Sequence, residues 1–218
     1  MIGKPPPRPP GPARKLDLVE LRIANLRREL EAESEPTSHA AILYQIGALY
    51  EHQLERVSDA MDHYGQAHAA APGFHPAIIA QLRIAERAKN GHDLAGLRSE
   101  HVATATSAAV SGAALMDLAL HSEDWASLLQ EAIARSPEPV VPALLLEWRS
   151  EAHGDQDALR HALRTQAEHS ADADLRAAVW VDVALGDIDA GHPDDAIDAL
   201  DCACDSDALV WQVAEDVA

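Results

Sequence analysis

Aromatic side chains are scarce in this sequence. They make up 4% of the 218 residues, with a single Phe, whereas 47% of the residues are hydrophobic. The hydrophobic content therefore consists largely of Ala and Leu, which favour helices and have modest side-chain volume. One large globular core needs bulkier side chains to fill it, so the composition favours thin helices that pack through alanine.

Cysteine and long hydrophobic runs are scarce as well. The only cysteines, Cys202 and Cys204, point in different directions on a helix, which disfavours a disulfide or a metal site. No apolar run approaches the roughly 18 residues of a membrane-spanning helix, and the start, MIGKPPPRPP, lacks the apolar core of a signal peptide. We therefore expect a cytoplasmic protein without membrane insertion. The Arg- and Ala-rich composition is typical of bacterial proteins.

Basic residues are rare in the second half of the chain. Residues 110–218 contain 5 Lys or Arg and 23 Asp or Glu, a net charge of −18, whereas residues 1–109 contain 12 and 13. An acidic surface repels nucleic acid and attracts basic proteins. We therefore expect no nucleic-acid ligand and a protein partner with a basic amphipathic segment. Four of the acids are expected in turns or on solvated faces: Asp187, Asp189, Asp194 and Asp195.

Patterns that carry chemistry are missing too. The sequence has no G-x-S-x-G, no phosphate-binding glycine loop and no G-x-G-x-x-G. The 12 histidines include no zinc-type pair four residues apart with a Glu between them, and His63 and His68 diverge on a helix. We therefore expect no enzymatic activity, no cofactor and no metal.

What the sequence contains is a series of helical periods separated by short breaks. Residues 1–14 are Pro-rich and basic and predict a solvated tail without a fold. Residues 15–35 predict a capping helix with an apolar seam at 3-4 spacing. Later breaks fall about every 17 residues, so residues 37–206 divide into about five helix pairs. Residues 207–218 predict the first helix of an incomplete unit or a C-terminal cap.

The helix pairs share a pattern of small and aromatic residues. The first pair carries Leu43-x2-Ile46-Gly47-x2-Tyr50, then Ala60-x3-Tyr64-x2-Ala67 and Pro72. Another carries Trp180-x2-Val183-Ala184, then Gly191 at the turn and Ala196-x3-Leu200-x2-Ala203. A third has Gly112-Ala113 and Met116, then Leu129-x2-Ala132 and Pro137, and copies at about 75–106 and 138–170 are weaker. The pattern resembles the tetratricopeptide repeat (TPR) family over residues 37–206.

The resemblance implies an all-α fold: a right-handed superhelical solenoid of antiparallel helix pairs, each buried only against its neighbours. Helices that pack closely need a small residue where they touch. Gly47 is therefore expected opposite Ala60 of its own pair, with Tyr50 and Tyr64 filling the space beside the contact.

The resemblance also implies a function. First helices of TPR pairs line a concave groove, so we expect a non-catalytic scaffold that binds a peptide or helical segment of another protein there. The predicted groove residues are Tyr44, Glu51, Ile79, Arg83, Glu86, Val110, Asp117, Glu147, Val181 and Ile188. Tyr44 and Ala48 stand where some family members use Lys and Asn to clamp chaperone carboxylates, which argues against that clamp.

Two other interpretations stay open. The chain is alternatively an N-terminal regulatory, targeting or oligomerisation module of a longer multidomain protein. Self-association through unpaired terminal helices is a further candidate interaction, because such helices have apolar faces without a partner.

Overall fold

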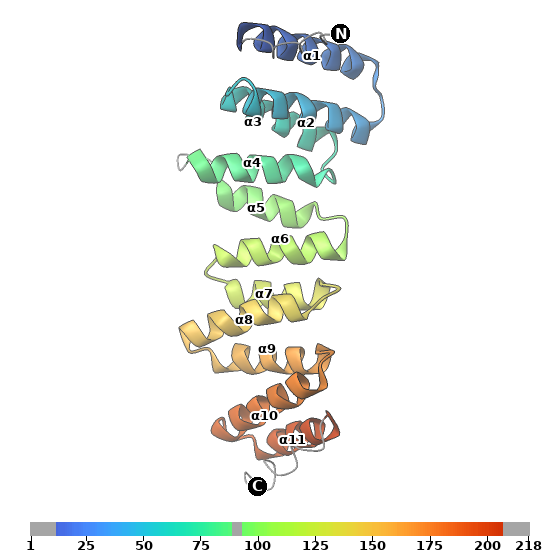
Figure 1. Ribbon diagram of the computed structural model, residues 1–218. Helices are drawn as coiled ribbons and strands as arrows, with labels where there is room; N and C mark the ends of the chain where they lie inside the picture. The colour runs from blue at the N-terminus through green and yellow to red at the C-terminus, as the bar shows by residue number, and fades with distance from the viewer. Residues whose placement is uncertain (1–11, 89–92, 207–218) are drawn as a thin grey trace, which may run out of the picture. The chain divides into compact units, whose positions relative to one another are not determined.

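The computed structural model describes residues 12–88 and 93–206, which form two compact units divided between Thr104 and Ala105 (Figure 1). The described residues form eleven α-helices and no strand, which confirms the all-α prediction. The predicted tail as far as residue 11 and the predicted last helix at 207–218 lie outside the described residues.

The first unit contains five helices. Their bounds are α1 (Pro12–Ala32), α2 (Pro36–His52), α3 (Val57–Ala70), α4 (His75–Ala88) and α5 (Leu94–Ala103). The helix α1 begins three residues before the predicted residue 15, so residues 12–14 are helical where a tail was expected. Proline is compatible with this start, because the first turn of a helix needs no backbone donor.

The second unit contains six helices. Their bounds are α6 (Ala108–Leu120), α7 (Trp125–Arg135), α8 (Val140–His153), α9 (Gln156–His169), α10 (Ala173–Asp189) and α11 (Pro193–Ser206). Several helices in both units begin at acidic residues that accept backbone N–H groups: Glu35, Asp93, Asp155 and Asp172. Part of the acidic composition is thus used to start helices, where a carboxylate satisfies free donors and the helix dipole.

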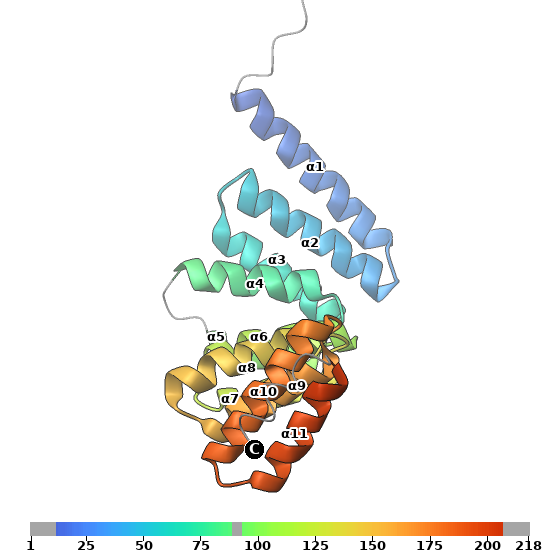
Figure 2. The ribbon, with the colours of Figure 1, turned by 60° about the horizontal axis from the view of Figure 1, so that its bottom comes forward.

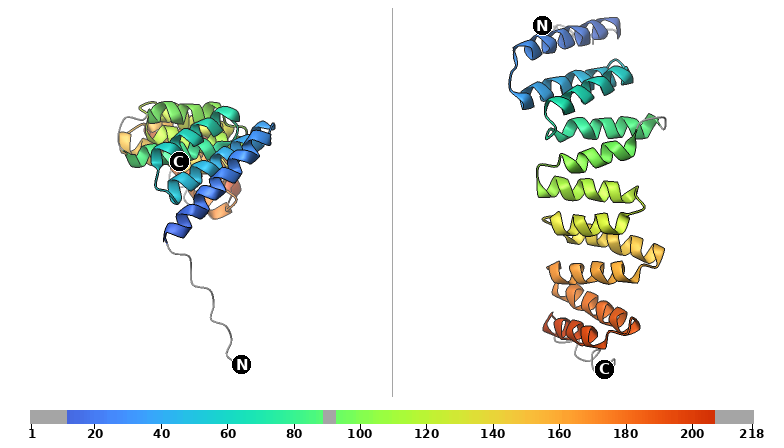
Figure 3. Two further views of the ribbon diagram at one scale, coloured as in Figure 1. Left: turned by 90° about the horizontal axis from the view of Figure 1, so that it is seen from above. Right: turned by 180° about the vertical axis from the view of Figure 1, so that it is seen from behind.

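Within each unit the helices pack in chain order. Each helix contacts the next one along the chain, both within a pair and between pairs. Figure 1 shows this succession for α1 to α5, and the right panel of Figure 3 shows it for α6 to α11. Figure 2 shows α10 and α11 running antiparallel as one such pair. Each unit is therefore a helical array in which each helix packs against its neighbours in the sequence.

The contact between α2 and α3 shows why a glycine stands inside a helix. A Cβ on Gly47 would lie 2.8 Å from Tyr64 Cε1 and 3.3 Å from the carbonyl oxygen of Ala60. Both distances are shorter than ordinary contacts of a Cβ atom, so any larger residue would push the two helices apart. The side chain of Tyr64 is fully buried in this contact.

The interior of each unit is built mainly from alanine and leucine. In the first unit Ile23 and Leu26 of α1 join Ile46, Tyr50 and Tyr64 in one buried cluster. In the second unit a cluster forms around Trp125, Leu129 and Leu146, and another forms around Val183, Ala196 and Ala199. Among the other predicted signature residues, Ala67, Gly112, Ala132, Ala184 and Ala203 are buried and Trp180 is half-buried, whereas Pro72 and Pro137 are exposed. Gly191 has φ +79° in its turn, a backbone conformation that favours glycine.

Candidate protein-interaction surfaces

The first helices of two pairs in the second unit expose apolar side chains. On α8, Val141, Leu144 and Trp148 are exposed, and Trp148 is the most exposed at 62%. Their spacing of three and four residues places them on one face of the helix, which we call the α8 stripe. The opposite face of α8 is buried through Ala143, Leu146 and Ser150, so the packing of the unit does not use the stripe.

The helix α10 has a second exposed apolar set. Leu185 and Ile188 are exposed three residues apart, and we call them the α10 stripe. Exposed carboxylates of Asp182 and Asp189 lie on the same helix beside them. An apolar surface with an acidic border attracts a segment that is itself apolar and basic.

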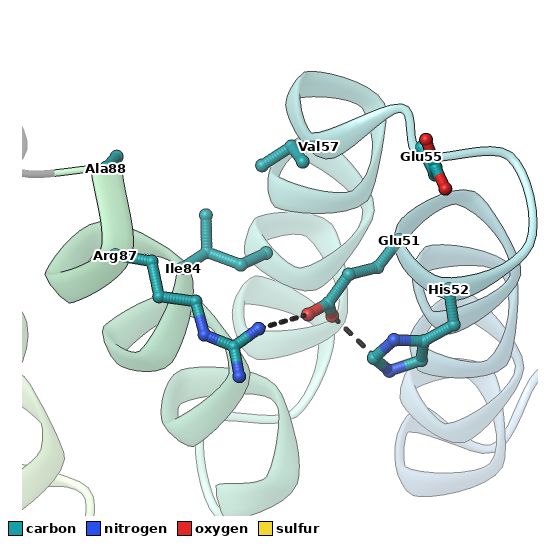
Figure 4. A pocket seen from close by; sticks show the side chains of 7 residues that line it. All are labelled: Glu51, His52, Glu55, Val57, Ile84, Arg87 and Ala88. Carbon is teal, nitrogen blue, oxygen red and sulfur yellow. Dashed lines mark ion pairs between the residues drawn. The ribbon is translucent and has the colours of Figure 1, made fainter.

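A pocket of about 400 Å³ opens in the first unit between α2, α3 and α4 (Figure 4). Its wall is apolar at Val57, Ile84 and Ala88. Its polar lining comes from Glu51, His52, Glu55 and Arg87, and the dashed lines in Figure 4 join Glu51 to His52 and Arg87.

The buried carboxylate of Glu51 is the centre of an ion-pair network. It accepts hydrogen bonds from the Tyr64 hydroxyl at 2.8 Å and from Arg83 Nη2 at 2.5 Å, and its side chain is only 6% exposed. Arg87 Nη1 lies 3.8 Å away and His52 Nε2 lies 3.7 Å away. Burial, and then the hydrogen bond to Glu51, raise the pKa of Tyr64 far above its ordinary value. Tyr64 is therefore a neutral donor, and this arrangement joins three helices.

The predicted groove residues of the first unit have different environments. Ile79 is exposed, as a docking residue must be. Tyr44 is half-buried and packs against Tyr64 and Phe74, with ring centroids 5.2 and 5.8 Å away. Glu51 differs most from the expectation, because its carboxylate is buried and engaged by Arg83. Glu86 accepts a hydrogen bond from the buried Arg98 at 2.5 Å.

The predicted groove residues of the second unit are mostly half-buried. Ile188 is exposed, and Val110, Asp117, Glu147 and Val181 are half-buried. The sequence interpretation missed the α8 stripe, although the three-and-four spacing of its members is visible in VVPALLLEW. That signal is ambiguous in the sequence, because Leu145 and Leu146 follow Leu144 directly and blur the apolar face.

Comparisons with known proteins find similar structures but no matching family. No protein-family model matches the chain, and no curated protein sequence matches it. A crystal structure of the MamA protein is similar at 16% identity and a TM-score of 0.41, covering 79% of this chain and 94% of that one. A crystal structure of the APC/C hetero-tetramer Cut9–Hcn1 is similar at 15% identity and a TM-score of 0.38. That match covers 90% of this chain and 39% of the other.

Not all acidic side chains of α10 are exposed to solvent. Asp187, expected on a solvated face, is 1% exposed. Its carboxylate accepts a hydrogen bond from Arg164 Nη2 at 2.6 Å and a longer one from Arg160 Nη1 at 3.5 Å. The prediction for Asp187 was therefore wrong, because two arginines of α9 compensate the burial of its charge. Asp189, Asp194 and Asp195 are exposed, as predicted.

Three histidines and one cysteine have environments that the structure defines. His68 is buried, and its Nε2 lies 3.0 Å from Glu100 Oε1. The rings of His75 and His101 are 5.6 Å apart, and burial, followed by the charge of His68, lowers the pKa of His75. Burial, and then Asp205, raise the pKa of Cys202. A thiol with a raised pKa is a poor nucleophile at neutral pH.

The length and apolarity of the described helices decide whether any of them could cross a membrane. In residues 12–88 and 93–206 no helix is both long and apolar enough to cross a bilayer.

Proposed function

We propose that the protein is a non-catalytic interaction scaffold that docks a basic amphipathic segment of a protein partner on the α8 and α10 stripes. The exposure of Trp148 beside Val141 and Leu144 is the observation that carries this proposal. Large exposed aromatic residues with apolar neighbours are typical of the energetic centres of protein interfaces.

The size of the available binding energy supports the choice of Trp148. Burying its exposed part removes on the order of 150 Å² of mostly apolar surface from water, which is worth about 4 kcal/mol before the costs of association. Those costs consume part of the gain, so we expect removal of the side chain to weaken binding by about 2 kcal/mol, roughly 30-fold.

The acidic composition supports the choice of a basic partner. The second half of the chain has a net charge of −18, and the carboxylates of Asp182 and Asp189 border the α10 stripe. These charges would raise the association rate of a basic segment and repel an acidic one. The apolar stripes would supply the affinity.

A peptide-binding experiment tests the proposal with defined probes. Two labelled helical peptides of equal length and equal leucine pattern, one carrying Lys and one carrying Glu, are titrated with the full chain and followed by fluorescence anisotropy. We expect the Lys peptide to bind, the Glu peptide not to bind, and Trp148→Asp to weaken binding roughly 30-fold.

Ile197→Asp is the matched control. Ile197 is also an exposed apolar residue, but it lies on α11, the second helix of its pair. Both substitutions add one negative charge, so a difference between them reports on the α8 stripe. Equal binding by wild type and Trp148→Asp would remove the support for this surface.

A further inference from the structure

The pocket between α2, α3 and α4 contains a buried carboxylate with one oxygen that is not hydrogen-bonded. The Glu51 side chain is 6% exposed, and its Oε2 atom accepts the hydrogen bonds from Tyr64 and Arg83. Among the residues that the structure describes, no donor lies within hydrogen-bond distance of the other oxygen, Oε1, and Arg87 Nη1 is 3.8 Å from it. Buried polar atoms are normally hydrogen-bonded, so Oε1 can accept a bond from a further donor.

Arg87 does not satisfy this oxygen. Its side chain is 72% exposed, and 3.8 Å exceeds the length of a hydrogen bond between a nitrogen and an oxygen. Figure 4 shows Arg87 and His52 on opposite sides of the Glu51 carboxylate. The contact between Arg87 and Glu51 is therefore a loose ion pair, of the kind that contributes little to stability, and the arginine is free to turn towards solvent.

The rest of the pocket suits an aliphatic chain. Val57, Ile84 and Ala88 form its apolar wall, and its volume of about 400 Å³ is within the range of pockets that bind small ligands. Glu55 adds an exposed carboxylate to the lining. A ligand that matches these groups has an apolar stem and a positively charged donor at its end.

The single available oxygen distinguishes between the two common cations of proteins. A guanidinium binds a carboxylate best when it donates two parallel hydrogen bonds, one to each oxygen. Arg83 already occupies Oε2 of Glu51, so a second guanidinium could not bind in this way. An ammonium is a compact charge that can donate to one oxygen alone, so the site favours an ammonium.

We propose that this pocket binds a primary alkylammonium group, whose aliphatic stem lies on Val57 and Ile84 and whose ammonium donates a hydrogen bond to Glu51 Oε1. A lysine side chain of a partner and a free aliphatic diamine both carry this group. The site is built by α2, α3 and α4 alone, so it goes beyond the proposed function and does not use the α8 or α10 stripe.

Arg87 should compete with such a ligand. Its guanidinium lies beside the position that the ammonium would take, and two like charges about 4 Å apart in water weaken binding roughly fivefold. Removing the Arg87 charge should therefore strengthen the binding of an amine. A pocket that bound anions through Arg87 would show the opposite change.

Chemical-shift titration of the isotope-labelled full chain tests the proposal with defined probes. N-acetyl-lysine methylamide and cadaverine carry the ammonium, pentanol is the neutral control and pentanoate is the anionic control. We expect the amines to bind with about millimolar affinity, since one charged hydrogen bond and a short stem supply the energy, and the controls not to bind. Binding of the lysine derivative alone would identify a protein partner as the source of the ligand, and binding of cadaverine alone would identify a free amine.

Two variants and a matched control assign the binding to this pocket. Arg87→Ala should strengthen amine binding roughly fivefold or more. Ala88→Phe fills the pocket and should abolish binding, and the fold should tolerate it because Ala88 is exposed. Arg28→Ala is the control for Arg87→Ala, because it removes the same charge at an exposed position on α1 that does not line the pocket. Its affinity for the amines should equal that of wild type.

Any of three results would overturn the proposal: no shift with either amine, binding of pentanol or pentanoate as strong as that of the amines, or weaker amine binding after Arg87→Ala. If Ala88→Phe fails to fold, Val57→Phe fills the pocket from α3, where Val57 is exposed. Unchanged amine binding in a folded pocket-filling variant would also overturn it, because the amine would then bind elsewhere.

Discussion

Replacing Asp187 with Asn should destabilise the packing of α10 on α9. The Asp187 carboxylate is fully buried and receives hydrogen bonds from Arg164 and Arg160. Removing one partner of a buried ion pair costs roughly 3–5 kcal/mol when the remaining charge stays buried. The Arg164 side chain is 38% exposed and can regain water, and Asn keeps one oxygen as an acceptor. We therefore expect a loss of about 2 kcal/mol, near the contribution of a hydrogen bond to a charged group.

Thermal unfolding by circular dichroism measures this loss. For a chain of this length, about 2 kcal/mol corresponds to a decrease of roughly 4–8 °C in Tm. Asp189→Asn is the matched control, because it removes the same charge from the same helix at an exposed position. Its effect should be within about 0.5 kcal/mol of zero. If the two variants unfold at the same temperature, the buried ion pair contributes nothing and the reasoning fails.

Two further predictions concern the first unit. Gly47→Ala should lower the unfolding free energy by about 1 kcal/mol or more despite the better helix propensity of Ala, because its Cβ would lie 2.8 Å from a ring carbon of Tyr64. The helical Gly186, where a Cβ meets nothing closer than 3.6 Å, is the control, and urea titration should show that Gly186→Ala is neutral or stabilising. Glu35 accepts backbone N–H groups at the start of α2, chiefly that of Thr37, which lowers its pKa from 4.5 to about 2. The ionised Glu35 therefore stabilises the fold above about pH 4.5, and this stabilisation is lost as the pH falls towards 2. Wild type should lose more stability than Glu35→Gln over that range. Parallel curves of stability against pH for the two proteins would contradict this.

The sequence was sufficient to predict the helix pairs and the need for a small residue at Gly47. Gly47 lies in an apolar helical period, where glycine is unfavourable, so its presence indicated a neighbouring backbone. The small Ala60 in the following helix identified that neighbour, and the pattern of small residues repeats along the chain. Such contacts are local in sequence, within one helix pair, and a local pattern specifies them.

The sequence was not sufficient to separate buried from exposed charges. Asp187 and Asp189 are two residues apart in an acidic stretch, yet one is buried and the other exposed. The difference arises from Arg160 and Arg164 on the preceding helix. Which face of α9 packs against α10 depends on the crossing geometry of the two helices. That geometry cannot be predicted from the composition of either helix alone.

The proposed docking surface differs from the predicted groove on α8. The prediction that first helices carry it named Val181 and Ile188, but on α8 it named Glu147 and not Trp148. Adjacent helix positions differ by about 100°, so a small error in the assumed orientation exchanges one residue for its neighbour. The structure places Glu147 against Gln166 Nε2 at 2.6 Å and leaves Trp148 exposed.

The network around Glu51 has a consequence for how the protein tolerates mutation. One carboxylate on α2 receives hydrogen bonds from Tyr64 on α3 and from Arg83 on α4. Loss of any one group changes the partners of the other two, so the three single substitutions should not have additive effects. A change at Glu51 would be tolerated more easily in a background where Arg83 had already changed. Among related chains these three positions should therefore vary together, and drift at any one of them should depend on the history of the other two.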